Sequence, residues 1–381
     1  MPIANEVKKR FNPRLFLIRL GDYCNLNCAY CYVNRGQGEI STDTLDTLIE
    51  LISKWVIKNA DQKVYIAFIG GEPLLFRNKI DYFIRNISKV LKKRLNKVSF
   101  KIQSNGTLIS REIVSWIKEN NIRIGISLDG PEDIHDHVRR DMKNEGSYNS
   151  VVEGIRLLKL SKIEPFVITV ITRYSYNKID RIVELLNHLG IHHFRMNPIL
   201  PIKKEHQNLA LTPNQFFQSI QQLVASLIKL NKKGFKIKES NLENLFAAFL
   251  GLTPRNICFR HPCGAGLDML VFNYDGRIYP CDNLISNEFI IGNIGSTSDI
   301  NELGSSEVIY KLISRVPPKE CERCGLQYLC NGGCLARIWN EKKTINGKSS
   351  WYCGFYRRVA PYLFEILLGE PEFIKGMLKS K

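Results

Sequence analysis

Apolar positions in the first half of the chain follow two alternating patterns. Short continuous apolar runs, typical of buried strands, cover residues 15–20, 64–69, 98–103, 122–128, 165–171 and 193–196. Between them, apolar residues recur at helical spacing over residues 43–59, 80–95, 112–120, 148–160 and 179–189. Continuous apolar strands separated by helices predict an α/β fold with a parallel sheet covered by helices.

Polar residues and glycines mostly follow these strands rather than precede them. Residues 70–72 follow the second strand, Asn105 the third, Asp129 the fourth and Asn197 the sixth. Ligands bind at the carboxyl ends of strands in α/β sheets. We therefore expect these positions to converge with residues 24–31 at one mouth of the sheet.

Two further helices and a cysteine-rich segment follow the alternating region. Helical spacing covers residues 213–233 and 242–250, and Asp275-Gly276 lies between two short apolar runs, which predicts a hairpin. The expected domains are a barrel over 1–205, a helical bridge over 206–255 and a cysteine-rich domain with a C-terminal helix over 256–381.

The composition of the 381 residues, 44% hydrophobic and 24% charged, is that of a globular chain. No apolar run approaches the roughly 18 residues that span a membrane, and the polar N-terminus lacks the apolar core of a signal peptide. We therefore expect a cytoplasmic protein with no membrane partner. The net charge of +17 fits a lysine-rich solvated surface or a basic groove for an acidic peptide. Without a dense basic block or an aromatic-basic motif, nucleic acid is not favoured as a partner.

The chain has 11 cysteines, so disulfide pairing would leave one over. Three of them, Cys24, Cys28 and Cys31, lie within eight residues with the spacing C-x3-C-x2-C. Because a [4Fe–4S] cluster normally takes four thiolates, three ligands leave one iron open to a small molecule. An open set of three and two full sets of four account for every cysteine, which favours three [4Fe–4S] clusters. A zinc knuckle with a fourth ligand from elsewhere is the alternative for the first set.

This spacing resembles the radical S-adenosylmethionine (SAM) superfamily. The resemblance implies an open partial (β/α)6 barrel, in which the amino and carboxylate groups of SAM bind the open iron. It further implies that an electron from the cluster cleaves SAM to release a 5′-deoxyadenosyl radical, and that flavodoxin or ferredoxin supplies that electron.

The motif Gly70-Gly71-Glu72-Pro73 resembles the GGEP motif of the same superfamily. Glycines let the backbone approach a ligand closely, and the carbonyls and the Glu72 carboxylate can accept hydrogen bonds from the SAM ammonium group. Taken alone, the motif could be a turn at a strand end.

Other SAM contacts are implied by the resemblance only. Tyr30 matches an adenine contact, Ser127 and Arg139 match ribose and carboxylate contacts, and Ile199 would lie beside the adenine. Core packing is the alternative for Tyr30, and the adjacent Arg140 is the alternative to Arg139 as the carboxylate fork.

The cysteines from Cys263 onward, together with Gly276, resemble the SPASM domain. The resemblance implies two further clusters with complete thiolate sets and an electron-transfer role. The first set is Cys258, Cys263, Cys281 and Cys334. The second set is Cys321, Cys324, Cys330 and Cys353. Two structural zinc sites would need the same number of ligands.

Asp282 follows Cys281 directly, where anaerobic sulfatase-maturating enzymes carry a proposed general base. A carboxylate beside an electron-accepting cluster could take the proton that a substrate radical loses on oxidation. A solvated turn aspartate is the alternative. We interpret His192, His193 and His261 as structural because the implied clusters already have their ligands.

The family resemblance predicts an enzyme that abstracts hydrogen from a ribosomally made precursor peptide and forms a C–C (cyclophane) or thioether crosslink. Three features favour this branch: the segment 263–266 (Cys-Gly-Ala-Gly), Asn283 after Cys281-Asp282, and Ile69 before the GGEP motif. The alternatives are formylglycine formation on a sulfatase and, in another class, a non-catalytic electron-transfer or zinc scaffold protein. About a dozen residues precede the first strand, so we expect a separate leader-binding protein or another surface to recognise the precursor.

Overall fold

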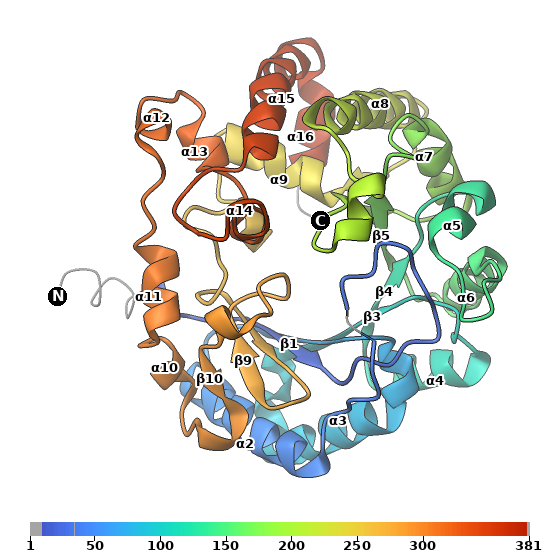
Figure 1. The fold of residues 1–381 in the computed structure, drawn as a ribbon. Coiled ribbons are helices and arrows are strands. Elements are labelled where there is room, and N and C mark those ends of the chain that lie inside the picture. Colours follow the sequence, from blue (N-terminus) through green and yellow to red (C-terminus); the bar gives the residue numbers. More distant parts are fainter. Residues whose placement is uncertain (1–9, 34, 379–381) are drawn as a thin grey trace. The chain divides into compact units, whose positions relative to one another are not determined.

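The computed structural model describes residues 10–33 and 35–378, in which strands and helices alternate along most of the chain (Figure 1). The described chain divides into two compact units. The first comprises residues up to 25, 33–125 and 264–315, and the second comprises 26–32, 126–263 and 316 onward.

The first unit is built on parallel strands flanked by a hairpin. β1 (Leu15–Arg19) pairs in parallel with β2 (Val64–Ile69), and β2 pairs in parallel with β3 (Val98–Ser104). On its other edge β1 pairs in parallel with β8 (Met269–Phe272). The antiparallel strands β9 (Arg277–Tyr279) and β10 (Gly292–Asn293) continue from β8.

Helices cover these strands through their apolar faces. α2 (Thr42–Lys58) buries the predicted face and begins at Ser41, whose side chain accepts a hydrogen bond from the Thr44 backbone N–H. The other helical segments of this unit are η1 (Pro73–Phe76), α3 (Arg77–Leu91), η2 (Lys92–Lys97), α4 (Arg111–Glu119), η5 (Asn287–Phe289), η6 (Ile294–Ser296), α10 (Ile300–Leu303) and α11 (Glu307–Ile313).

The second unit contains the parallel strands β5 (Phe166–Ile171), β6 (His193–Pro198) and β7 (Lys238–Glu239). β4 (Arg123–Ser127) lies at the division between the units. The helices that follow β4 and alternate with the strands are α5 (Glu132–Val138), α6 (Tyr148–Leu160), α7 (Ile179–His188), η3 (Lys204–Leu209), α8 (Pro213–Lys232) and α9 (Ser240–Phe249). The C-terminal part adds η4 (Ile257–Phe259), α12 (Lys319–Glu322), α13 (Gln327–Cys330), α14 (Leu335–Lys342), α15 (Ser350–Gly369) and α16 (Pro371–Leu378).

Most predicted elements appear within a few residues of their expected ends. The strand at 64–69 and the helix at 148–160 have the predicted bounds. The helix predicted to run to 95 ends at Leu91, because Lys92 has a φ of 49° and the chain continues as a short 3-10 helix. The short α5 and the two-residue β7 were not predicted, since neither is long enough to show a periodic apolar pattern.

The hairpin predicted around Asp275-Gly276 is confirmed. Gly276 has a φ of 85° and its N–H donates to the carbonyl of Asn273, 2.9 Å away. Because β8 also pairs with β1, the compact units do not follow the predicted boundary at residue 256. In the part of the chain that the structure describes, no helix is both long and apolar enough to span a membrane.

Candidate functional site

The turn after β3 supports the first cysteine of the predicted cluster loop. Asn105 Nδ2 donates to Asn25 Oδ1 at 2.8 Å and lies 3.9 Å from the sulfur of Cys24. Asn25 in turn donates to Thr107 Oγ1 at 2.9 Å. Asn105 therefore lies next to the cysteine loop, as expected for a polar residue that follows a strand of the sheet.

The other two cysteines of this loop are described in the second unit. The Cys31 N–H donates to the Cys28 carbonyl at 3.1 Å, and the Ala29 N–H donates to Val138 at 2.8 Å. Arg139 Nη1 lies 4.0 Å from the Cys28 sulfur. The loop thus places a guanidinium beside one of the three cysteines that would hold a cluster.

Glycine is required in the GGEP turn because the backbone there lies against the cysteine loop. Gly70 has a φ of 136°, and a Cβ on Gly71 would come within 1.8 Å of the Tyr23 carbonyl oxygen. The Gly71 N–H donates to the Gly21 carbonyl at 3.0 Å. No side chain larger than hydrogen fits at residue 71 without moving the loop.

Glu72 accepts several hydrogen bonds from within the chain. Its carboxylate is fully buried and accepts hydrogen bonds from Leu74 N–H (3.0 Å), Ser104 Oγ (2.8 Å) and Asn105 N–H (2.7 Å). These bonds begin η1 and fix the turn after β3. Glu72 therefore positions Asn105, while the backbone of the glycine turn remains the part of the motif that a SAM ammonium could meet.

A buried ionic group centred on Asp129 lies in the second unit. Tyr30 Oη donates to Asp129 Oδ2, and Arg139 Nε donates to the same oxygen at 2.8 Å. Asp129 Oδ1 accepts from the Val170 N–H at 2.8 Å. The guanidinium also lies over the Tyr30 ring, 5.2 Å from its centroid. Burial raises the pKa of Tyr30 well above its ordinary value, so the phenol stays protonated and donates to the carboxylate.

Arg140, the alternative to Arg139, is exposed and donates to the carbonyls of Asp136 and Asn144. These bonds hold its side chain on its own loop. Arg139, in contrast, is buried and held by Asp129.

His135 extends this network and was not predicted. Its Nδ1 accepts from the Asp129 N–H at 3.2 Å, its Nε2 lies 3.0 Å from Ser147 Oγ, and Ser147 donates to the Arg139 carbonyl at 2.8 Å. Burial lowers the pKa of His135 to about 4, so the imidazole is neutral near pH 7. The only sequence signal was a histidine shortly after Asp129, on a helix that the pattern did not reveal.

The two predicted adenine contacts lie in one apolar cluster. Tyr30 and Val170 pack against Val138, Ile199 and Leu209. Ser127, the predicted ribose contact, is half-buried at the end of β4. The structure therefore brings Tyr30, Arg139 and Ile199 close together within the second unit.

One of the two C-terminal cysteine sets surrounds a single pocket. Cys321, Cys324, Cys330 and Cys353 line it together with Lys348 and Tyr356. Burial raises the pKa of the Cys330 thiol to about 11, so ionisation of this thiol would be coupled to metal binding. Among the described residues, no three metal-ligating side chains are close enough to hold a single ion. A four-iron cluster spaces its thiolates more widely because each binds a different iron, and the four-cysteine pocket fits such a cluster.

The other predicted set is divided between the units. Cys258, Cys263 and Cys334 belong to the second unit, and Cys281 belongs to the first. The Cys258 N–H donates to Asn256 Oδ1 at 3.1 Å.

Asp282, the predicted general base, is half-buried next to Cys281. Its Oδ1 lies 3.5 Å from the Cys281 sulfur, within hydrogen-bonding distance of the thiol, and the Asn283 N–H points at the same sulfur from 3.5 Å. Two of the histidines interpreted as structural face backbone carbonyls, His192 that of Lys236 and His261 that of Leu329, each at 3.2 Å.

Comparison with known proteins identifies two domains. The Radical SAM superfamily matches residues 18–192, and SPASM, an iron–sulfur cluster-binding domain, matches residues 263–325. A cysteine-type anaerobic sulfatase-maturating enzyme of Clostridium novyi (strain NT) is 31% identical over 324 residues, covering 82% of this chain and 84% of that enzyme.

Solved structures share the fold. The anSMEcpe structure with bound AdoMet and the Cp18Cys peptide has a TM-score of 0.81 at 23% identity, covering 96% of this chain and 98% of that chain. Streptococcus suis SuiB bound to the precursor peptide SuiA has a TM-score of 0.70 at 16% identity, covering 92% and 79%.

These matches confirm the predicted family and the α/β barrel with a C-terminal SPASM domain. The sequence matches show that this chain belongs to the radical SAM enzymes that carry a SPASM domain, the family of the anaerobic sulfatase-maturating enzymes.

Proposed function

We propose that this radical SAM enzyme modifies a ribosomally made precursor peptide by hydrogen abstraction and joins two of its side chains through a C–C or thioether bond. The observation that carries the proposal is the turn at residues 264–266, whose Gly-Ala-Gly sequence resembles crosslinking peptide maturases. The Gly266 N–H donates to the Pro280 carbonyl at 2.9 Å, and Gly266 has a φ of 73°. The turn thus holds the residue that precedes Cys281-Asp282.

Residues of this chain fit both a cluster and SAM. Cys24, Cys28 and Cys31 would hold the cluster with an open iron, which supplies the electron for SAM cleavage. The glycine turn, Ser127, Arg139 and the apolar pair Tyr30 and Ile199 would bind and orient SAM. Because Asp129 already fixes Arg139 and Tyr30, the cofactor would meet side chains that need little further ordering.

Crosslinking removes two hydrogens from the peptide in all. One leaves as a hydrogen atom to the 5′-deoxyadenosyl radical, and the other leaves as a proton with one electron when the new bond forms. Asp282 would take the proton. The remaining eight cysteines would hold the two clusters that accept the electron.

Formylglycine formation is the second candidate, and the 31% identity to a cysteine-type sulfatase-maturating enzyme favours it. It also begins with hydrogen abstraction from a side-chain carbon, so the proposed SAM site serves both reactions. Ile69 and Asn283 depart from the residues that the sulfatase branch tends to carry at these positions. A non-catalytic scaffold is not favoured, because the chain belongs to a family of radical enzymes.

The product distinguishes the two reactions. Anaerobically reconstituted protein would be incubated with SAM, a reductant and two peptides, one from a short precursor gene beside this gene and one with a sulfatase modification sequence. We expect the precursor peptide to lose two hydrogens and to resist fragmentation between the joined residues in tandem mass spectrometry. A hydrazide-reactive aldehyde on the sulfatase peptide, with no crosslink on the other, would contradict crosslinking and establish the second candidate.

The triple variant Cys24→Ala, Cys28→Ala, Cys31→Ala is the control. It should form neither product nor 5′-deoxyadenosine, while most of the other iron stays bound. Formation of 5′-deoxyadenosine by this variant would mean that the radical site lies elsewhere.

A further inference from the structure

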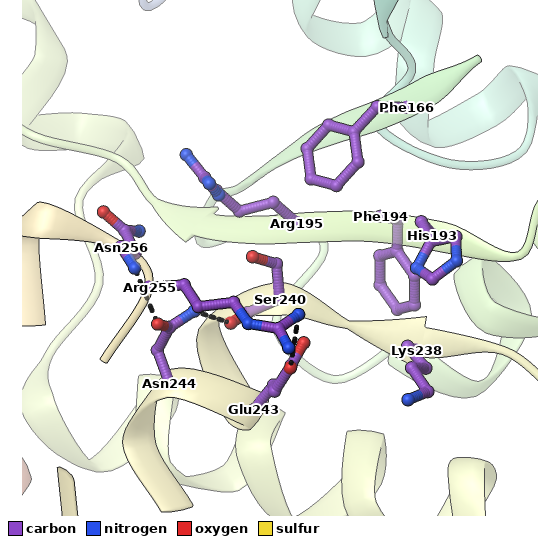
Figure 2. A pocket seen from close by; sticks show the side chains of 10 residues that line it. All are labelled: Phe166, His193, Phe194, Arg195, Lys238, Ser240, Glu243, Asn244, Arg255 and Asn256. Atoms are coloured by element: carbon purple, nitrogen blue, oxygen red, sulfur yellow. Dashed lines mark hydrogen bonds and ion pairs between the residues drawn. The ribbon is translucent and has the colours of Figure 1, made fainter. Parts of the chain in front are cut away.

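A pocket of about 250 Å³ lies in the second unit, separate from the predicted cofactor contacts (Figure 2). Side chains from β5, β6, β7 and α9 line it, together with the two residues that precede η4. Those that bear on its chemistry are Phe166, His193, Arg195, Lys238, Glu243 and Arg255.

Arg195 brings a positive charge and an unpartnered donor to this pocket. Its Nε is buried and has no hydrogen-bond partner among the described residues. Figure 2 shows Arg195 and Phe166 projecting from neighbouring strands, and the guanidinium carbon lies 5.6 Å from the centre of the Phe166 ring. A buried donor without an acceptor raises the free energy of the folded protein, so a ligand that accepts a hydrogen bond from Nε would be bound favourably.

The one carboxylate in the lining of the pocket is paired with another arginine. Arg255 pairs with Glu243 at 3.4 Å, and the Lys238 ammonium donates to the carbonyl of Met377 at 3.0 Å, which leaves its charge in place. Within this lining, basic side chains therefore outnumber the single carboxylate.

Two neighbouring titratable groups complete the charge environment. His193 is largely neutral near pH 7, because burial, followed by Lys238, lowers its pKa. The carboxylate of Glu239 accepts from the N–H groups of Met196 and Leu242. Burial raises the pKa of Glu239 to about 7, while the charge of Arg195 is among the influences that lower it, so Glu239 supplies Arg195 with part of a counter-charge.

The chemistry of Arg195 favours a carboxylate. The edge of a guanidinium formed by Nε and one terminal nitrogen binds a carboxylate through two parallel hydrogen bonds. Since Nε is buried without a partner, a carboxylate that enters the pocket would satisfy this edge. The nearby aromatic ring limits how the guanidinium can turn.

The register of β5 and β6 relates the pocket to the predicted SAM contacts. Ile168 is the partner of Arg195 and Val170 is the partner of Asn197, so alternation places Arg195 and Val170 on the same face of the sheet. Val170 packs with Tyr30 and Ile199. Arg195 lies four residues before Ile199, or about 13 Å along an extended strand at ~3.3 Å per residue.

We infer that this pocket binds the side-chain carboxylate of an Asp or Glu in the peptide substrate, about four residues from the residue that is modified. An extended peptide beside β6 would cover this separation while its reacting residue lies near Tyr30 and Ile199. The inference rests on the proposed peptide substrate, but it does not depend on which bond the enzyme forms.

Binding of matched peptides tests the inference. Labelled nine-residue peptides would carry Cys or Trp at the centre and either Glu or Gln at one position, two to four residues away on either side. Their affinities for the cluster-loaded enzyme with SAM would be measured anaerobically by fluorescence anisotropy. We expect the Glu peptide to bind the unmodified enzyme about 10- to 100-fold more tightly than its Gln partner at a spacing near four residues.

Two variants separate the pocket from the general positive charge of the protein. Arg195→Gln should bind both peptides as weakly as the unmodified enzyme binds the Gln peptide. Arg156→Gln removes the same charge from an exposed residue of α6 that pairs with Glu153, and should keep the preference for Glu. Arg195→Lys, which retains the charge, should keep part of the preference even if Arg195→Gln folds poorly.

Several results would overturn the inference. Two of them concern the unmodified enzyme: equal binding of the Glu and Gln peptides, or no measurable binding of any Glu peptide. The others concern the variants: a Glu preference that is undiminished in Arg195→Gln, or one that is fully kept in Arg195→Lys but lost in Arg156→Gln. Competition by inorganic phosphate that disappears in Arg195→Gln, without a Glu preference, would instead identify a site for small anions. If the Glu preference is present but the product is formylglycine, the inference stands and only the proposed crosslink fails.

Discussion

At the scale of single residues, Asp129 joins three parts of the chain that are far apart in sequence. Its carboxylate accepts hydrogen bonds from Tyr30, Arg139 and the backbone of Val170, and its side chain is 1% exposed. A buried ion pair of this kind contributes little net stability, but loss of one partner leaves the other charge unpaired. Asp129 therefore decides whether Arg139 and Tyr30 keep the orientation that a cofactor would need.

Asp129→Asn should weaken SAM binding and lower the free energy of unfolding by about 3–5 kcal/mol, because the buried Arg139 loses its counter-charge. Equilibrium dialysis with SAM and denaturant titration would measure the two effects. Asp133→Asn is the matched control, since Asp133 pairs with Arg181 at 2.9 Å on the exposed surface of α5. This variant should change SAM binding and the free energy of unfolding little. Equal effects of the two variants would show that Asp129 is not needed to hold Arg139 and Tyr30 in place.

His135 should make stability depend on pH. Its folded-state pKa of about 4 lies below the ordinary 6.5, so between these values the unfolded chain binds a proton that the folded chain excludes. The stabilisation is complete above pH 6.5 and declines as the pH falls toward 4, by about 2 kcal/mol at pH 5.

Denaturant titrations over this pH range should show a smaller decline for His135→Gln than for the unmodified protein. His188→Gln, which changes an exposed histidine at the end of α7, should decline as the unmodified protein does. A steep decline that persists in His135→Gln would assign the proton to another group.

Asp282→Asn should lower product formation by roughly 10²–10⁴-fold, the usual contribution of a general base, and should leave SAM cleavage intact. 5′-Deoxyadenosine would then accumulate in excess of modified peptide, which chromatography measures directly. Asp275→Asn, in the hairpin that precedes Cys281 and paired with Arg277, should keep the normal ratio of 5′-deoxyadenosine to modified peptide. If Asp282→Asn loses iron instead, the carboxylate supports Cys281 rather than removing a proton.

At the scale of elements, the turn after β2 has to be narrow because it passes the segment that leads into the cysteine loop. The Glu72 N–H donates to the Tyr23 carbonyl at 2.9 Å, so the turn and that segment are bonded directly. A change in the turn is therefore transmitted to the position of Cys24.

Gly71→Ala should displace the cysteine loop, because its Cβ would lie 1.8 Å from the Tyr23 carbonyl oxygen. We expect loss of the iron bound at the first site and of SAM cleavage, read by iron analysis and 5′-deoxyadenosine formation. Gly295→Ala places its Cβ in ordinary contact, 3.5 Å from Asn293, and should behave as the unmodified protein. Normal iron and cleavage in Gly71→Ala would show that the turn can move without consequence.

At the scale of the whole molecule, the cysteine count predicts about 12 irons per chain after anaerobic reconstitution, as three four-iron clusters. Replacing the four cysteines of the pocket with Ala should leave about 8 irons and preserve SAM cleavage. Metal analysis and electron paramagnetic resonance would measure this. Two zinc ions per chain with a single cluster would contradict the predicted sets, which are Cys258, Cys263, Cys281 and Cys334, and Cys321, Cys324, Cys330 and Cys353.

The sequence by itself determined the features that depend on neighbours along the chain. The spacing of Cys24, Cys28 and Cys31 predicts a cluster loop because its ligands lie within one short segment. The bounds of β2 and α6 follow from apolar periodicity, which reports the local face that each element buries. The glycine turn and the cysteine pattern of the SPASM segment were also predictable, because each consists of residues at fixed spacings along the chain. The family was predictable from these motifs.

Only the tertiary structure decided which distant residues become partners. Tyr30 and Asp129 are 99 positions apart and yet share a buried hydrogen bond. Glu72 could bind a ligand by its chemistry, but folding surrounds it with three donors from the chain. Arg195 resembles many other basic residues in the sequence, and only the folded chain buries its Nε without a partner. Burial and pairing depend on contacts between segments far apart in the chain, and a local pattern does not encode them.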